Sequence, residues 1–232
     1  MLSTEGTVIL SIRDKDITTI GDMNLADDER IGFEAPFFEC KSLLRVDLKG
    51  CTKLTLMGKW VVGQCTSLMM SVVLPDSLTQ LGEGAFNCIS LASVVLPDSL
   101  SLLGESAFGE CTFLTSVVLL DSLKQLIKGA IAECSSLTSE VLLDSLTQIC
   151  EEAFVDCSFL TSVVLPDSLS HNGKAAFVGC TSLNSMVFPG SLALIGLLAF
   201  GKCTFLTSVK LLDSLEQLSK EAFADCSFLT SC

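Results

Sequence analysis

The sequence predicts a solenoid, in which short coils stack along one axis and share a parallel β-sheet on one face. The first observation is a row of cysteines that stand 23 residues apart. The second is the motif around each cysteine, because its apolar residues recur at the same places. A period of about 20 to 50 residues is typical of stacked arrays. The row comprises Cys65, Cys88, Cys111, Cys134, Cys157, Cys180, Cys203 and Cys226.

The unit that starts at Cys157 shows what each part of a coil should form. Val163 and Leu165 stand two residues apart, which is the alternation typical of a short strand, and Leu160 is the apolar residue just before them. The Ser-Leu-x-x-Leu segment that follows fits either a helical turn or a second short strand, and we favour the extended form. The piece Ala176–Phe177, just before the next cysteine, predicts a single helical or 3₁₀ turn. Because one unit cannot bury enough apolar surface alone, each coil needs neighbours on both sides.

The chain divides into two parts in this interpretation. Residues 1–30 depart from the motif and are expected to form an N-terminal cap region, with strand-like alternation at Val8 and Leu10. Residues 31–232 form the array of about eight repeats, which we expect to be truncated at its C-terminus, inside a unit. Trp60 falls on an outer position of an irregular unit, where it either covers that unit or contacts a partner.

The repeat resembles a known family. The motif L-x-x-V-x-L-P-D-S-L-x-x-L-G-x-x-A-F-x-x-C is similar to the BspA-type leucine-rich repeat. The resemblance implies a leucine-rich repeat solenoid with a parallel sheet on one face and turns, 3₁₀ or helical segments on the other. It also implies a cell-surface protein that acts in adhesion or protein interaction. The residues that carry it, repeated in later units, are Leu91, Val94, Leu96, Pro97, Leu103, Gly104, Ala107, Phe108 and Cys111.

Charge and hydropathy narrow the function classes. The chain has 27 acidic and 14 basic residues and a formal net charge of −13. This charge disfavours binding to nucleic acid and to an anionic membrane surface. The first residues show neither the basic head nor the apolar core of a signal peptide. No apolar run approaches the roughly 20 residues of a membrane-spanning helix.

The cysteine row is interpreted as part of the core. Cysteines in adjacent coils could lie close enough for disulfides, but parallel, inward side chains would have the wrong dihedral angle. A straight row also cannot surround a zinc ion tetrahedrally. We therefore expect reduced, buried thiols and neither a metal nor a cofactor site.

Other motifs give little support for catalysis. Gly196–Lys202 matches most of a phosphate-binding loop, but its apolar residues occupy core positions of the repeat. His171 is the single histidine and is expected to be solvated in a turn. Aspartate precedes serine at the same place of several units, as at Asp98 and Asp167, where its carboxylate is expected to cap a turn. No enzymatic activity is expected, because a cleft with two unlike converging groups is not indicated.

The candidate site is the outer surface of the predicted sheet. The residue between the two core positions of each strand is usually valine, and threonine and serine precede it. An aligned apolar stripe often marks a contact surface, although valine also simply suits a strand. The candidate protein-binding residues are Val95, Val118, Val141, Val164, Val187, Thr115, Ser116, Thr138, Ser139, Thr161 and Ser162.

These observations favour a scaffold that binds an unidentified protein ligand through the sheet face. The alternative is a structural element that associates with itself end to end. A further expectation concerns Glu140, which stands where Val117 and Val163 stand in other units. A buried carboxylate there would have a raised pKa and would be a local weak point.

Overall fold

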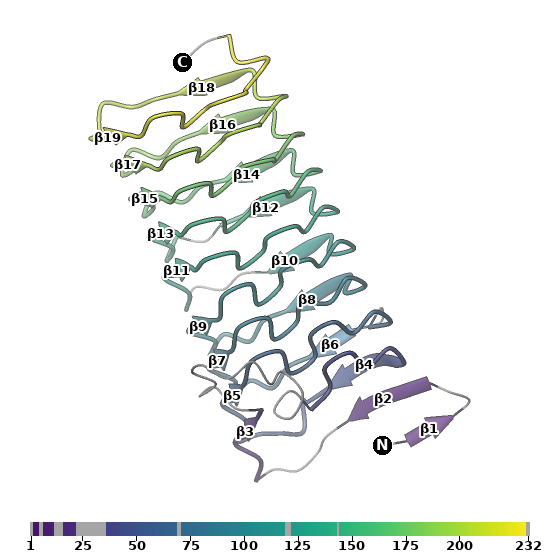
Figure 1. Ribbon diagram of the computed structural model, residues 1–232. Helices are drawn as coiled ribbons and strands as arrows, with labels where there is room; N and C mark the ends of the chain where they lie inside the picture. Colours follow the sequence, from purple (N-terminus) through teal and green to yellow (C-terminus); the bar gives the residue numbers. More distant parts are fainter. Residues whose placement is uncertain are drawn as a thin grey trace.

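The chain forms a stack of coils along a single axis, with the N-terminus and the C-terminus at opposite ends (Figure 1). The computed structural model describes residues 2–4, 7–11, 16–21, 36–68, 71–118, 122–142 and 144–230. Within these ranges there are strands and turns but no helix. Each complete coil contributes one strand to a first side, one shorter strand to a second side, and a turn that leads to the cysteine.

The first side, which we call the broad side, carries strands of three to five residues. Paired neighbours are parallel, the row is divided into three separate sheets, and the side chains alternate between buried and outward. The strands are β4 (Leu43–Asp47), β6 (Ser71–Val73), β8 (Ser93–Val95), β10 (Ser116–Val118), β12 (Ser139–Val141), β14 (Ser162–Val164), β16 (Ser185–Val187) and β18 (Ser208–Lys210).

The second side, the narrow side, carries parallel strands of only two residues each. They come from the Ser-Leu-x-x-Leu segments, so the extended form expected for these segments is confirmed. The strands are β3 (Thr19–Ile20), β5 (Leu56–Met57), β7 (Gln80–Leu81), β9 (Leu102–Leu103), β11 (Gln125–Leu126), β13 (Gln148–Ile149), β15 (His171–Asn172), β17 (Leu194–Ile195) and β19 (Gln217–Leu218).

The pairing register is the property that positions the candidate site. In β8 and β10, Ser93, Val94 and Val95 pair with Ser116, Val117 and Val118, which lie 23 residues later. Each position of the repeat therefore lies beside its own copy, about 4.8 Å away across a strand pair. The side chains that occupy one repeat position thus form a column along the solenoid.

The third segment of the coil is a turn, and the helical or 3₁₀ form considered for it is not found in the described residues. Some backbone bonds close the turn on itself, such as the one from the Gly109 N–H to the Ser106 carbonyl (2.8 Å), but others reach the next coil. The Phe108 N–H donates to the Ala130 carbonyl (3.0 Å), and the Phe154 N–H to the Ala176 carbonyl (2.8 Å). A helical turn would direct these N–H groups along its own axis. Left-handed residues, such as Glu152 (φ 59°), make the turn possible.

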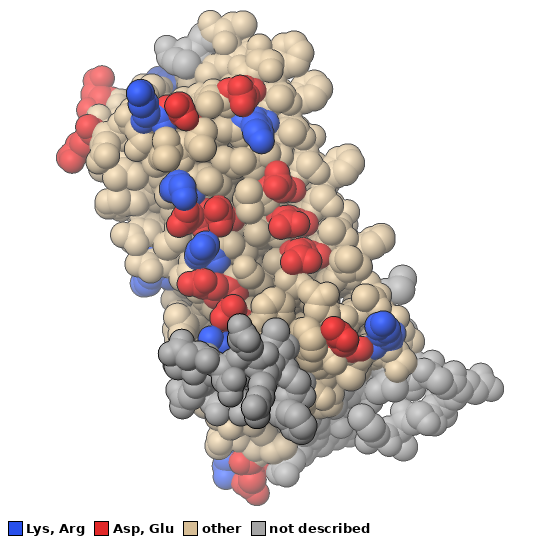
Figure 2. Space-filling model, viewed as in Figure 1, with Lys and Arg blue, Asp and Glu red and all other residues tan. Residues whose placement is uncertain are grey.

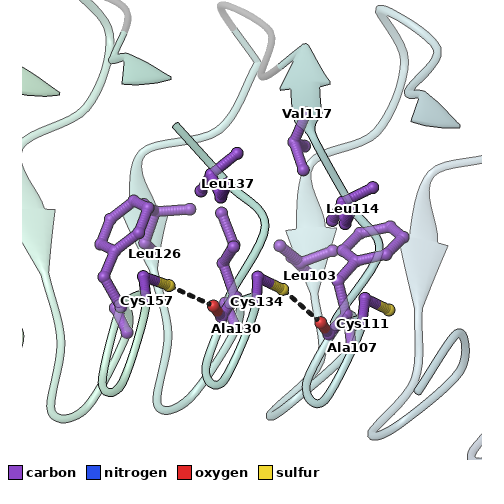
Figure 3. Packing of buried hydrophobic residues seen from close by; sticks show 14 of the residues in the cluster. Leu103, Ala107, Cys111, Leu114, Val117, Leu126, Ala130, Cys134, Leu137 and Cys157 are labelled. Atoms are coloured by element: carbon purple, nitrogen blue, oxygen red, sulfur yellow. Dashed lines mark hydrogen bonds between the residues drawn. The ribbon is translucent and has the colours of Figure 1, made fainter. Parts of the chain in front are cut away.

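The interior is a set of columns that run the length of the array. Phe154, Phe177 and Phe200 are fully buried and stack with ring centroids 5.0 and 5.3 Å apart. The thiols of the cysteine row also point inward, and Figure 3 shows Cys134 and Cys157 directed at the coil before each of them. The expectation that the cysteine row is an interior column is confirmed.

Close backbone approach between coils depends on a glycine column. A Cβ atom added to Gly104 would lie 2.2 Å from the carbonyl carbon of Gly82, and one added to Gly196 would lie 2.6 Å from that of Gly173. Ile127 takes this place in the coil after Gly104. The narrow side is divided there, since β9 and β11 belong to separate sheets.

The N-terminal end adds two further strands. β1 (Leu2–Thr4) pairs antiparallel with β2 (Thr7–Ser11), and β2 pairs parallel with β4, so the broad side begins before the repeats. The boundary expected at residue 30 lies outside the described residues. Trp60 is half-buried, with its ring edge-on to Phe38 and directly over Gly84, as a covering residue would be.

Candidate binding face

The outward valines of the broad side form one exposed column, which we call the valine column. Val95, Val118, Val164 and Val187 are 66%, 51%, 57% and 74% exposed. Their neighbours in the strands, such as Val94 and Val117, are buried. The side chain of the fifth predicted residue, Val141, lies outside the described part, although its backbone pairs with Val164.

The threonines and serines beside this column differ in what their hydroxyls do. The threonine hydroxyls bond within the solenoid: Thr115 Oγ1 donates to the Ala92 carbonyl (3.2 Å) and Thr161 Oγ1 to the Thr138 carbonyl (2.9 Å). The hydroxyls of Ser116 and Ser162 are exposed and have no described partner. Of the predicted pairs, threonine therefore links coils, while serine remains available at the surface. Thr138 and Ser139 are also exposed, just before β12 and at its first residue, and the Thr138 hydroxyl has no described partner.

A second exposed apolar row lies just before the broad strands, and the sequence interpretation missed it. Its members follow the row cysteine by two residues, and each exposes more than half of its surface. Phe205 and Phe228 lie 5.7 Å apart between ring centroids. The recurring Cys-x-Phe could have revealed this row, because the motif assigns no core position there. The residues are Phe113, Phe159, Phe205 and Phe228.

The other edge of the valine column carries exposed aspartates, which we call the aspartate rim. The carboxylate caps expected here are wrong, since serine makes the contact: Ser99 Oγ donates to the Leu78 carbonyl (2.6 Å) and Ser168 Oγ to the Leu146 carbonyl (2.7 Å). No described residue bonds to the rim carboxylates. The rim comprises Asp76, Asp98, Asp144, Asp167 and Asp213.

Two shallow hollows lie between the valine column and the aspartate rim. The first has a volume of about 370 Å³, and its lining includes Val73, Val95 and Asp76. The second has a volume of about 430 Å³, and its lining includes Val164 and Asp167. Each hollow therefore combines an apolar wall with one carboxylate.

The cysteine row holds neighbouring coils together through its thiols. Cys134 Sγ donates to the Phe108 carbonyl (3.1 Å) and Cys180 Sγ to the Phe154 carbonyl (3.2 Å). Burial raises the pKa of Cys134, Cys180 and Cys203 well above the ordinary thiol value. A protonated thiol is the form that can donate these bonds, and a buried thiol of this kind is a poor nucleophile.

The remaining motifs do not form a catalytic site. Ser170 Oγ lies 2.7 Å from His171 Nδ1, but both belong to the open narrow side and lie outside the described hollows. His171 is exposed in β15 and not in the expected turn. In the segment Gly196–Lys202, Ala199 and Phe200 are fully buried, so the loop cannot surround a phosphate.

Two polar residues stand at core positions of the repeat. The side chain of Glu140 lies outside the described residues, so its expected burial and raised pKa stay predictions. Asn172 replaces the aliphatic residue of the narrow strands and is fully buried. Neither its Oδ1 nor its Nδ2 has a described hydrogen-bond partner. Asn172 is therefore an unfavourable core residue in an otherwise apolar column.

The turn side carries charges of both signs. Lys174 Nζ lies 2.5 Å from Glu151 Oε1, and Lys59 Nζ lies 3.1 Å from Glu83 Oε2. Figure 2 shows acidic and basic side chains gathered in rows along the solenoid. The broad-side residues between Val73 and Val187, by contrast, include no lysine or arginine.

The stacked coils, the single repeated motif and the exposed sheet face define a repeat scaffold. The sequence matches the BspA type leucine rich repeat region, with 6 copies, over residues 29–138 and 124–232. The chain belongs to this family, and the resemblance predicted from the motif is confirmed. None of the curated proteins matches the sequence.

Solved structures share the fold. A leucine rich cell surface protein from Faecalibacterium prausnitzii is 23% identical with a TM-score of 0.56, and the match covers 85% of this chain and 61% of that one. A leucine-rich repeat protein from Eubacterium ventriosum is 24% identical with a TM-score of 0.62, covering 73% and 44%. The chain thus spans less than two thirds of the length of either. A leucine rich repeat protein from T. pallidum is 35% identical with a TM-score of 0.59, covering 63% and 68%.

A separate finding concerns membranes. Within the described residues, no helix is long and apolar enough to cross a bilayer.

Proposed function

We propose that this chain is a protein-binding or adhesion scaffold that presents the broad side of the solenoid to its ligand. The observation that carries the proposal is the valine column, in which four aligned valines each expose more than half of their surface. An aligned apolar surface of this kind favours contact with another molecule. The free serine hydroxyls beside it offer hydrogen bonds that fix the orientation of a ligand.

A location at the cell surface, which the adhesion form of this function requires, is supported by one relative. The Faecalibacterium prausnitzii protein is described as a cell surface protein. The proposal assigns no catalysis to this chain, because no described hydrogen bond joins an aspartate to a serine in the hollows of the broad side.

Capture of protein ligands by the immobilised chain tests the proposal. Changing Val118, Val164 and Val187 to glutamate should abolish capture, because three charges would enter the apolar contact. The matched control changes the exposed leucines Leu102, Leu197 and Leu218 to glutamate, with the same change in charge, and should retain capture. Both variants should keep the far-ultraviolet circular dichroism of the wild type, since all six positions are exposed.

Two results would contradict the proposal. If the valine variant captured the same proteins as the wild type, the broad side would not be the binding surface. If light scattering showed that the wild-type mass rises with concentration and the valine variant stays monomeric, the face would join copies of this chain instead.

A further inference from the structure

The aspartate rim adds a charge of one sign to the apolar broad side. Asp76 and Asp167 are exposed, and each lines a hollow together with exposed valines. Asp98 and Asp144 lie exposed between them in the row. Because serine makes the contacts between coils at this turn, the rim carboxylates have no structural task among the described residues.

Two acids of the turn side, by contrast, have partners of opposite charge. Glu151 and Glu83 each face a lysine of the adjoining coil. No lysine or arginine stands among the broad-side residues from Val73 to Val187. None of the ion pairs within the described residues involves a rim aspartate. A ligand that brings positive charge would supply the missing counterions.

We propose that the ligand of the broad side is a basic polypeptide segment, with apolar side chains over the valine column and lysine or arginine side chains in the hollows. The aliphatic stem of a lysine or arginine would lie along Val95 or Val164. Its charged head would reach the carboxylate of Asp76 or Asp167, as long cationic side chains do at apolar surfaces. This inference rests on the proposed function and names the chemistry of its ligand.

Other occupants fit these observations less well. A nucleic acid or an anionic membrane would meet the rim with like charge. A metal ion needs several converging ligands, and the described residues contain no group of three histidine, cysteine or acidic side chains able to hold one. A second copy of the chain would add a second acidic rim without a cation.

A synthetic peptide of alternating lysine and valine is the probe. Its fluorescence anisotropy should show saturable binding to the wild-type protein, and added salt should weaken this binding by screening the ion pairs. A peptide of alternating glutamate and valine should not bind, and one of alternating lysine and serine should bind at least about tenfold more weakly.

Matched variants separate the rim from the overall charge. Changing Asp76, Asp98 and Asp167 to asparagine should weaken binding of the lysine–valine peptide by about tenfold or more. The control changes Glu105 and Glu110 to glutamine and Asp156 to asparagine, which removes three exposed acids of the turn side. The control should bind within about twofold of the wild type, because screened distant charges contribute little.

Equal weakening in the two variants would overturn the inference, since binding would then follow net charge alone. Binding of the lysine–serine peptide as tight as that of the lysine–valine peptide would also overturn it, because the valine column would have no part. If the rim variants bound normally while the valine-to-glutamate variant still lost its captured proteins, the proposed function would stand and only the basic ligand would be rejected.

Discussion

The broad side and the turn side of this solenoid carry the same 23-residue repeat but treat charge in different ways. On the turn side, Glu151 lies beside Lys174, so opposite charges alternate along the axis. Glu133, in another column, lies between Glu110 and Asp156, and partial burial and these two carboxylates raise its pKa. The valine column of the broad side carries no charge from Val73 to Val187, and the same register position holds Asp47 before this stretch and Lys210 after it.

The difference shows that stacking limits which charges a repeat position can carry. Each residue lies about 4.8 Å from its copy in the next coil, so an acidic position repels itself unless a lysine intervenes. The turn side also contains the thiol bonds, the glycine column and the left-handed residues, all of which depend on neighbouring coils. The broad side contributes fewer such constraints on its outer surface and can therefore vary for binding.

The largest predicted effect is a loss of folding stability at alkaline pH, through the buried thiols that make turn-side contacts. Above the ordinary thiol pKa of about 8.5, cysteines of the unfolded chain ionise while the buried thiols of Cys134, Cys180 and Cys203 do not. Stability is therefore complete below about pH 8.5 and falls as the pH rises, by about 1.4 kcal/mol per pH unit for each thiol. Urea unfolding at several pH values measures this slope.

A variant with these three cysteines changed to valine is the control. Its pH dependence should be shallower, whatever its absolute stability. The chain has no tyrosine, so no phenol ionises in the same window. An unchanged slope in the variant would show that the thiols are not responsible.

The second prediction compares one residue from each side. Gly104→Ala should cost about 2–3 kcal/mol, because the new Cβ would lie 2.2 Å from the backbone of Gly82. Val118→Ala on the broad side should change stability by less than about 0.5 kcal/mol. Urea unfolding of both variants tests the contrast, and equal losses would refute the constraint assigned to the glycine column.

The third prediction concerns the narrow side. Asn172→Leu should stabilise the protein by about 1–3 kcal/mol, because it removes two buried polar atoms without partners and restores the apolar column. The exposed residue Asn184 supplies the matched control, and Asn184→Leu should leave the free energy of unfolding nearly unchanged. Destabilisation by Asn172→Leu would mean that the amide has a favourable contact.

The smallest effect is expected for Glu133→Gln, with a gain of about 0.2–1 kcal/mol at neutral pH from relief of like-charge repulsion. Since the folded-state pKa of Glu133 is raised, its charged form destabilises the protein above that pKa. The gain should vanish below the unfolded pKa of about 4.3, where the carboxyl is protonated in both states. Thermal unfolding across this pH range provides the measurement.

Glu151→Gln is the comparison variant for this last experiment, because it removes a carboxylate that faces Lys174. It should lower stability at neutral pH or leave it unchanged. A gain in both variants would indicate a general effect of net charge and not of the two columns.

Most of the repeat could be predicted from residue spacing. The inward cysteines, the strand at Val163 and the extended Ser-Leu-x-x-Leu segment follow from periodicity, and the structure confirms them. The exposed phenylalanines, such as Phe159, were missed because the motif treats their position as variable. The role expected for Asp167 as a turn cap was wrong, since Ser168 bonds across to Leu146, 22 residues earlier.

The order of apolar residues along the chain was sufficient to determine the stacked architecture, because a period of 23 residues places each core side chain beside its copy. Contacts between coils determined the local features that the period does not specify. They fixed a turn instead of a helix at Phe154, separated bonded threonines from free serines beside the valine column, and left the aspartate rim without partners. These outcomes depend on atoms more than 20 residues apart, whose distances no local pattern records.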